Sequence, residues 1–413
     1  MTQPFHTPGR SAIRLHPERF QTLKANRLRV AIGCILPVVL LGTLALGQVR
    51  PVSPNNFKAL SAKADAARVN GNLEQATLLY RRALALHSDW REGWWSLGMV
   101  QYVRSDYAGA ARAFQKVIAL MPDAETGTAH GMLGLCEFEL DQDHRALRDI
   151  EQGLLLGISN DTELLDVLRY HDGILQQRMA RFEGARRVFN GLCADGLQTQ
   201  ELRNGIGMVA LRMNARNPPP EGSVAGQVVD RVGYASCLQA QEKFDAARSA
   251  YASVAQRYPD FPNVHYAYGT FLVSIHHEAE AIQEFKQEIK NDPKDVMSRL
   301  QIASADYRID SAAGIPYAEE AVKINPNYPF GHYVLGLLLV DAKQYPPAVT
   351  ELEIARRDFP NVPRVYFSLA IAYAHVGRTQ DAVRARAKFA QLKQEQSTVH
   401  QDTEDAIDSK SMQ

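Results

Sequence analysis

The fold is decided by residues 92–122, which read EGWWSLGMVQYVRSDYAGAARAFQKVIALMP. This segment has two halves, and in each the apolar residues recur three or four positions apart, which is the spacing of amphipathic helices. A proline closes the segment, at a place where it cannot continue a helix. The positions that define the spacing are Trp94, Leu97, Gly98, Ala110, Phe114 and Pro122.

The same spacing returns along the chain with a period of about 34 residues. Four prolines that close successive segments lie at positions 259, 293, 326 and 360, so the steps between them are 34, 33 and 34 residues. Such a period indicates stacked helix pairs, because one pair is too small to bury its own apolar face. The clearest copies contain His265, Tyr268, Gly269, Ala281 and Phe285; His332, Leu335, Gly336, Ala348 and Leu352; and Tyr366, Leu369, Ala370, Tyr373 and Ala382.

These residues resemble the tetratricopeptide repeat, in which W-x2-L-G-x2-Y is followed by A-x3-F and then by proline. The resemblance implies an all-α fold, a right-handed solenoid of stacked helix-turn-helix units that follows an N-terminal apolar helix. About nine units are recognisable between Asn56 and Glu395. The family also implies a protein that binds other proteins or peptides and uses no cofactor.

One unit departs from the pattern. A helix-like segment, 201–213, precedes three successive prolines, 218–220, which exclude a regular second helix. We therefore expect an extended connector in its place and a division of the array there. The predicted segments are a basic leader (1–29), a transmembrane anchor or signal segment (30–49), a first repeat block (56–197), the degenerate unit with its proline-rich connector (198–227), a second repeat block (228–395) and a disordered tail (396–413).

Composition argues against nucleic acid as a partner. Lysine plus arginine and aspartate plus glutamate each number 46, whereas binding to phosphate backbones favours an excess of positive charge. The cysteines are too widely spaced for a disulfide framework or for a metal pair, so we expect the last three to pack as small buried apolar residues. The four are Cys34, Cys136, Cys193 and Cys237.

The N-terminus predicts export. Val30–Leu46 reads VAIGCILPVVLLGTLAL, and the residues before it include six basic side chains and one acid, Glu18. This bias predicts a cytoplasmic N-terminus and a single pass through the inner membrane at 30–49, with the repeats on the periplasmic side. The run is at the lower length limit for a span. Ala45 and Gly47 also fit cleavage near Gly47 and secretion to the periplasm, so both outcomes stay open.

Two motifs that suggest chemistry are better explained by the repeats. Residues 205–210 match G-x-G-x-x-A, with Asp230 further on, but a dinucleotide site needs a strand before the glycines and the preceding residues predict a helix. His276 and His277 are adjacent, whereas helical metal ligands lie three or four positions apart, so a solvated turn is the better interpretation. We therefore expect no enzyme, no catalytic or metal-binding residue and no small-molecule substrate.

The predicted binding surface is a row of aromatic residues. In the family that the repeats resemble, the first helix of each pair lines a concave groove. Aromatic side chains give large contact area at low entropic cost, although any single one of them could instead pack between neighbouring units. The candidate contact residues are Trp95, Tyr102, Phe138, Tyr170, Tyr266, Tyr307, Phe330, Tyr333 and Phe367.

The sequence favours a non-enzymatic scaffold that binds a peptide or protein segment in this groove, on the extracytoplasmic side of a membrane. The alternative is a chaperone or secretion accessory that holds unfolded clients. It would differ from a scaffold by binding many unrelated proteins. An enzyme with an unrecognised site is disfavoured, because the segments outside the array are too short for a catalytic domain.

Overall fold

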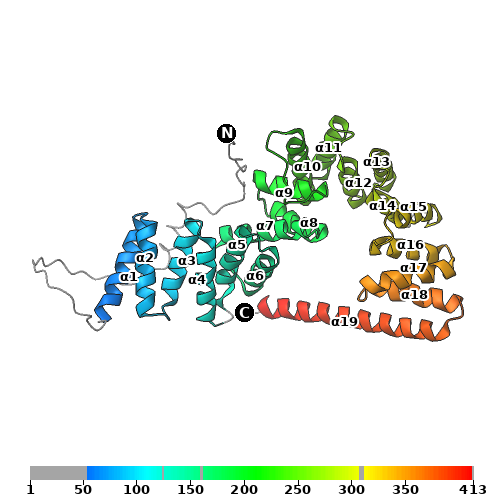
Figure 1. Ribbon diagram of the computed structural model, residues 1–413. Coiled ribbons are helices and arrows are strands. Elements are labelled where there is room, and N and C mark those ends of the chain that lie inside the picture. The colour runs from blue at the N-terminus through cyan, green and yellow to red at the C-terminus, as the bar shows by residue number, and fades with distance from the viewer. Residues whose placement is uncertain (1–53, 123–124, 159–160, 307–310, 412–413) are drawn as a thin grey trace, which may run out of the picture. The chain divides into compact units, whose positions relative to one another are not determined.

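The computed structural model describes residues 54–122, 125–158, 161–306 and 311–411, and in these ranges the chain forms nineteen α-helices and no strand (Figure 1). The all-α prediction is thereby confirmed. Two predictions lie outside the described residues, namely the apolar segment 30–49 and the contact residue Tyr307. No helix among the described residues has the length and apolar character needed to cross a bilayer.

The chain separates into two compact units, which meet in sequence between Gln241 and Glu242. The first unit contains α1 (Pro54–Val69), α2 (Leu73–Leu86), α3 (Arg91–Val103), α4 (Tyr107–Ala119), α5 (Gly127–Glu139), α6 (Asp143–Leu156), α7 (Thr162–Arg178), α8 (Phe182–Ala194), α9 (Gln200–Ala210) and α10 (Val224–Ala240). The second contains α11 (Phe244–Arg257), α12 (Val264–Ser274), α13 (Glu278–Asn291), α14 (Val296–Asp306), α15 (Ser311–Ile324), α16 (Pro329–Asp341), α17 (Tyr345–Asp358), α18 (Pro363–His375) and α19 (Thr379–Ser411).

Within each unit, consecutive helices form pairs that pack on one another, such as α3 with α4 and α12 with α13. A small residue on the first helix faces a large one on the second. A methyl group on Gly98 would lie 2.9 Å from the ring of Phe114, and one on Gly269 would lie 2.6 Å from that of Phe285. Both rings are fully buried. The glycines therefore let the two helices approach closely enough to enclose the ring.

The turn inside each pair has one conformation. The second residue after the first helix has a positive φ, and the next N–H donates to the carbonyl five residues earlier, as from Asp106 to Gln101 at 2.8 Å. This is the Schellman motif, which usually places glycine at the left-handed position. Only two of the nine described examples have glycine at the left-handed position, so the glycines of the sequence did not reveal this turn. They are Gly71, Ser105, Asp141, Ala180, Arg212, Glu242, His276, Lys343 and Gly377.

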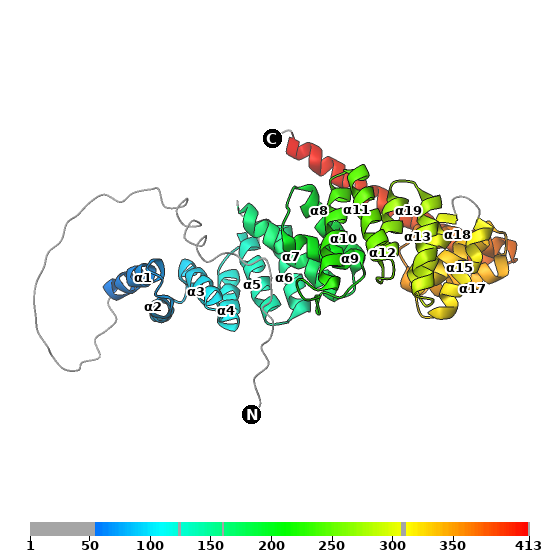
Figure 2. The ribbon, with the colours of Figure 1, turned by 90° about the horizontal axis from the view of Figure 1, so that it is seen from above.

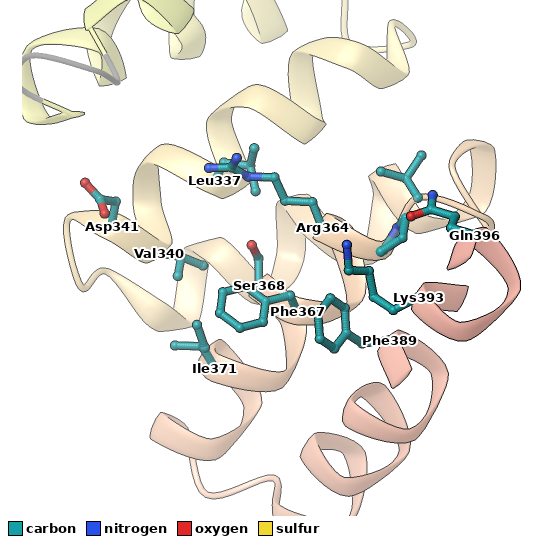
Figure 3. A pocket seen from close by; sticks show the side chains of 12 residues that line it. Leu337, Val340, Asp341, Arg364, Phe367, Ser368, Ile371, Phe389, Lys393 and Gln396 are labelled. Atoms are coloured by element: carbon teal, nitrogen blue, oxygen red, sulfur yellow. The ribbon is translucent and has the colours of Figure 1, made fainter. Parts of the chain in front are cut away.

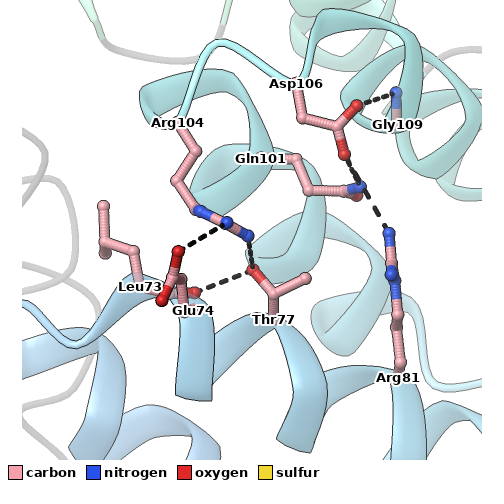
Figure 4. Close-up of polar contacts among 8 residues, drawn as sticks. All are labelled: Leu73, Glu74, Thr77, Arg81, Gln101, Arg104, Asp106 and Gly109. Carbon is pink, nitrogen blue, oxygen red and sulfur yellow. Dashed lines mark hydrogen bonds and ion pairs between the residues drawn. The ribbon is translucent and has the colours of Figure 1, made fainter.

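Polar side chains join neighbouring pairs, as Figure 4 shows for α2, α3 and α4. Asp106 caps α4 and accepts hydrogen bonds from Gln101 Nε2 at 2.7 Å and from a backbone N–H of α4 at 3.0 Å. Burial acts to raise the pKa of Asp106, but these bonds and nearby arginines such as Arg81 hold it below its ordinary value. Arg104 reaches back to α2 and donates to Thr77 Oγ1 at 3.2 Å.

The degenerate unit differs from its expected form. After the prolines the chain forms α10, which lies beside α9 and takes the place of its second helix (Figure 1 and Figure 2). The two backbones meet at glycines, since a methyl group on Gly233 would lie 1.9 Å from the carbonyl oxygen of Arg203. One on Gly207 would lie 2.0 Å from that of Val229. Because α10 packs on α9, the first compact unit includes α10 and ends after it.

A disulfide joins α8 to α10, which corrects the expectation that the cysteines pack separately. Cys193 and Cys237 are bonded; they are 44 positions apart in sequence, with 5.1 Å between their Cα atoms. The amide of Gln241 also donates to the carbonyl of Cys193 at 3.0 Å. The two residues meet only because α10 folds back over α9, which spacing in the sequence did not show. Cys136 is free and buried, and burial raises the pKa of its thiol.

The last helix is longer than any other described. α19 spans 33 residues and continues through most of segment 396–413, for which composition predicts disorder. That segment contains no glycine or proline to end the helix.

The contact between α9 and α10 can be tested with a pair of glycine variants. Gly233→Ala forces two backbones apart and should lower the free energy of unfolding by about 1–3 kcal/mol. Gly191→Ala is the matched control in α8, since its methyl group would meet only the mobile end of Arg169. That change should raise the stability by up to about 1 kcal/mol, because alanine favours helix. Chemical denaturation followed by circular dichroism measures both, and equal effects would contradict the close approach.

Removing the disulfide should destabilise the first unit. A loop of this length contributes about 4 kcal/mol through the entropy of the unfolded chain, so Cys193→Ala/Cys237→Ala should unfold at lower denaturant concentration. A thiol reductant should move the wild-type midpoint towards that of the variant and leave the variant unchanged. Both proteins retain Cys136, which serves as an internal control. A wild-type midpoint that does not change when the reductant is added would exclude the disulfide.

Candidate functional site

Three of the predicted contact residues pack against the second helix of their own repeat. In each case an aromatic ring lies against a phenylalanine 19 residues later, with 5.3, 5.8 and 6.0 Å between ring centroids. The predicted row therefore also serves packing inside each repeat. The pairs are Trp95 with Phe114, Tyr170 with Phe189, and Tyr266 with Phe285.

Burial removes three members of the row from contact with a partner. Phe138, Tyr170 and Tyr266 are only 5%, 6% and 6% exposed. The guanidinium of Arg178 lies 4.3 Å from the ring centroid of Phe138 and donates a hydrogen bond to buried Asp143 at 3.0 Å. These side chains offer almost no surface, so they do not support the predicted role as contacts.

The remaining described members keep some exposed surface. Trp95, Tyr102, Phe330 and Tyr333 are half-buried, whereas Phe367 is 50% exposed. Within its repeat, the position that holds phenylalanine in other units is Arg386, four residues after Ala382. No ring therefore occupies the position of the second helix that Phe114 occupies opposite Trp95, and Phe367 stays half exposed.

Phe367 lines a pocket of about 580 Å³ formed by α16, α18 and α19 (Figure 3). Its ring lies 5.4 Å from that of Phe389, which α19 contributes. Leu337 and Val340 of α16 and Ile371 of α18 add aliphatic surface. The size is within the range of about 300–1,000 Å³ that is typical of ligand pockets.

The polar groups of the pocket stand at separate places. The Arg364 side chain extends toward Leu337, away from Lys393, and Asp341 lies at the far end of the pocket (Figure 3). Ser368 adds a hydroxyl between them. The lining contains no histidine or cysteine and only one carboxylate. This arrangement suits binding of an apolar group beside a charge.

Sequence reasoning missed the part of this pocket that α19 supplies. Only first helices were considered for the groove, whereas Phe389 and Lys393 belong to the second helix of the last repeat. The signal was available in the sequence. A phenylalanine at 389, three positions after the site of the usual ring, indicates that the last repeat is built differently.

The histidines that replace the tryptophan of the repeat each bind a carboxylate. The partner is on the second helix, 19 residues later, with 2.8, 2.6 and 2.5 Å between the imidazole Nδ1 and a carboxylate oxygen. These cross-helix pairs give the three histidines a structural role. The pairs are His130 with Asp149, His265 with Glu284, and His332 with Glu351.

The two motifs that suggested chemistry lie in ordinary repeat elements. Residues 205–210 are part of α9, and Gly207 is needed for its contact with α10. His276 occupies the left-handed turn position, and His277 binds Glu280 at 2.8 Å. No group of three potential metal ligands occurs among the described residues.

Charge pairing makes the buried His265 more basic. Burial acts to lower the pKa of this imidazole, but the hydrogen bond and the charge of Glu284 raise it above its usual value. Because the folded pKa is the higher one, the pair stabilises the fold fully below the unfolded pKa of about 6.5. That contribution is lost as the pH rises through the raised pKa.

The pH dependence can be measured with His265→Gln. At pH 5.5 the variant should lose about 1–2 kcal/mol of unfolding free energy, which is the contribution of a charged hydrogen bond, and the loss should shrink at pH 9. The exposed turn variant His276→Asn is the control and should show little pH-dependent difference from wild type. A loss from His265→Gln that does not change with pH would exclude a charged pair.

Comparisons with known proteins agree with this architecture. Residues 61–125, 236–296 and 333–392 match the family model described as tetratricopeptide repeat. No curated protein matches the chain. A crystal structure of MamA is 23% identical, with a TM-score of 0.37 over 40% of this chain and 96% of that one. MamA 41-end from Desulfovibrio magneticus RS-1 is 17% identical (TM-score 0.37; 40% and 97% covered). YrrB, titled a TPR protein with an unusual peptide-binding site, is 14% identical (TM-score 0.36; 42% and 91% covered).

Proposed function

We propose that this chain, which belongs to the tetratricopeptide-repeat family, is a non-enzymatic scaffold on the extracytoplasmic side of a membrane. It binds a peptide or protein segment on the first-helix face of its repeats. Repeats of this family generally serve as protein-interaction scaffolds. The observation that carries the proposal is the pocket of α16, α18 and α19, where Phe367 stays half exposed.

Exposure of this ring is the argument for a partner. Phe138, Tyr170 and Tyr266 are buried within their own repeats, whereas half of the Phe367 surface stays exposed. An aromatic side chain in water that neighbours apolar surface favours association with another apolar group. Half-buried Phe330 and Tyr333, whose ring centroids are 5.9 Å apart, extend the aromatic surface of α16.

Two independent features support the location. Disulfides persist in oxidising compartments and are rare in the cytosol, and Cys193 and Cys237 form one. The basic leader and the apolar run at 30–46 are typical of an export or anchor segment. The proposed location is the periplasmic side of the inner membrane, with 30–49 as the anchor or, alternatively, as a signal cleaved near Gly47.

A crosslinking experiment tests the scaffold. Full-length protein crosslinked in membranes and then purified should recover one recurrent partner, identified by mass spectrometry. Phe367→Ala with Tyr333→Ala should lower that yield at least about tenfold, since aromatic anchors dominate interface energies. Val383→Ala is the matched control, because Val383 is an exposed apolar residue of α19 that does not line the pocket.

The result separates the two functions. Circular dichroism must first show that each variant is folded. A partner yield that stays unchanged in the double variant would place the binding surface elsewhere. Recovery of many unrelated proteins, together with suppression of their aggregation, would instead favour the chaperone alternative.

A further inference from the structure

The second helices of the first three repeats carry a basic face on their exposed side. Each of α2, α4 and α6 contains a fully buried alanine, namely Ala76, Ala110 and Ala146. The residues two, six and nine positions after each alanine form a stripe at helical spacing. These nine residues include four cations and no acid, and all are exposed except the half-buried Gln152. They are Leu78, Arg82 and Ala85 in α2; Arg112, Lys116 and Ala119 in α4; and Arg148, Gln152 and Leu155 in α6.

The repeat places the three stripes on one surface. Because they occupy the same positions of the repeat, they point in the same direction from successive second helices. Figure 2 shows α2 and α4 in one layer and α1 and α3 in the other, so the basic face lies on the side away from the first helices. It shares no residue with the pocket of α16, α18 and α19.

The cations of the basic face are not neutralised by close partners. Within the described part of the chain, none of the four forms an ion pair or a hydrogen bond, and Arg82 and Lys116 are the most isolated. Arg148 acts on a carboxyl group only at longer range. Burial raises the pKa of Glu137 to about 7, and the charge of Arg148 opposes this rise without a hydrogen bond.

The acids nearest to the basic face are held by other groups. Asp106 accepts hydrogen bonds from Gln101 and from the backbone of α4, and Arg112 adds only its charge. Glu74 binds Arg104 with 3.3 Å between nitrogen and oxygen. The face therefore keeps a positive charge that an external anion can approach.

Exposed leucines accompany these cations. Leu78, Leu120 and Leu155 are 50%, 38% and 80% exposed, and no other leucine in the described ranges is exposed. Leu78 and Leu155 belong to the stripes, and Leu120 follows Lys116 by four positions at the end of α4. One exposed leucine is ordinary in a folded protein. Three that gather beside cations suit a surface that is anionic outside and apolar beneath.

We infer that the basic face lies on the anionic phospholipids of the membrane that anchors the chain. The cations bind lipid phosphates, and the leucines enter the boundary between headgroups and acyl chains. This inference rests on the proposed membrane location. Residues 47–53 separate the apolar run from α1, and seven residues reach at most about 25 Å. The first repeats are thus tethered close to the headgroups.

Tethering favours lipid over an acidic protein as the occupant of this face. The anchor keeps the headgroups at a high local concentration, so that even modest attraction from each cation suffices for docking. Contact through the second helices leaves the first-helix side of these repeats turned away from the bilayer. That side stays open to the partner of the proposed scaffold.

A fluorescent probe at Ala119, within the basic face, tests the contact in the full-length protein. Cys34→Ala/Ala119→Cys is labelled without reductant, so that the buried Cys136 and the disulfide do not react. The protein is reconstituted in vesicles of phosphatidylcholine, with or without phosphatidylglycerol, that contain a lipid with a quencher on its headgroup. The probe should be quenched in the anionic vesicles only, and high salt should reverse most of the quenching.

Charge reversal and a matched probe site provide the controls. Arg82→Glu/Lys116→Glu should lower the ratio of docked to undocked protein at least about tenfold, since each basic residue near an anionic surface contributes about fivefold. Both side chains are exposed, so circular dichroism should stay that of the wild type. Gln256→Cys is the matched site in α11, nine positions after the buried Ala247, where serines replace both cations. Its probe should not respond to phosphatidylglycerol.

The outcomes separate this inference from the proposed function. Equal quenching at both sites, or in both kinds of vesicle, would overturn the basic face as the contact. An unquenched Ala119 probe, with a partner still crosslinked in membranes, would overturn the lipid contact and leave the scaffold intact. If charge reversal then removed that partner, the face would belong to an acidic protein. A chain that does not stay with phosphatidylcholine vesicles would overturn the anchor, and the inference would stand only if anionic vesicles retain it.

Discussion

Several helix pairs depend on one contact, in which a small residue of the first helix lies against a large buried side chain of the second. The rings of Phe114, Phe189 and Phe285 are enclosed this way by Gly98, Gly173 and Gly269. Such an approach fixes both the distance and the register of the two helices, because a close-packed interior tolerates neither a gap nor an added methyl group. The cross-helix pairs between histidine and carboxylate, 19 positions apart, then add a polar constraint.

The same constraint explains why the functional surface is limited. A ring that fills the space between two helices is not available to a partner, which is why Tyr170 and Tyr266 are buried. Where the second helix lacks its large residue, as at Arg386, the ring of the first helix remains exposed. The candidate site is thus a place where the repeat pattern is incomplete, and its chemistry comes from residues that the pattern does not specify.

The middle of the chain shows how a broken repeat is accommodated. Proline at 218–220 prevents the usual return helix, yet the apolar face of α9 must still be covered. Helix α10 covers it, through glycines that allow backbone contact, and the Cys193–Cys237 disulfide fastens α10 to α8. Covalent attachment compensates for a connector that lacks regular structure, since it removes conformations from the unfolded chain.

The sequence by itself determined the helical class and the repeat period. These properties follow from residue type at fixed local spacing, and spacing of that kind is visible in one dimension. Only the tertiary structure decided which aromatic side chains stay exposed, that α10 returns to α9, and that two cysteines 44 residues apart are bonded. Exposure and pairing of this kind depend on what the neighbouring helices bring, such as Phe389 and Lys393 beside Phe367. No spacing within one repeat encodes such contacts, because they arise between elements whose approach is set by packing.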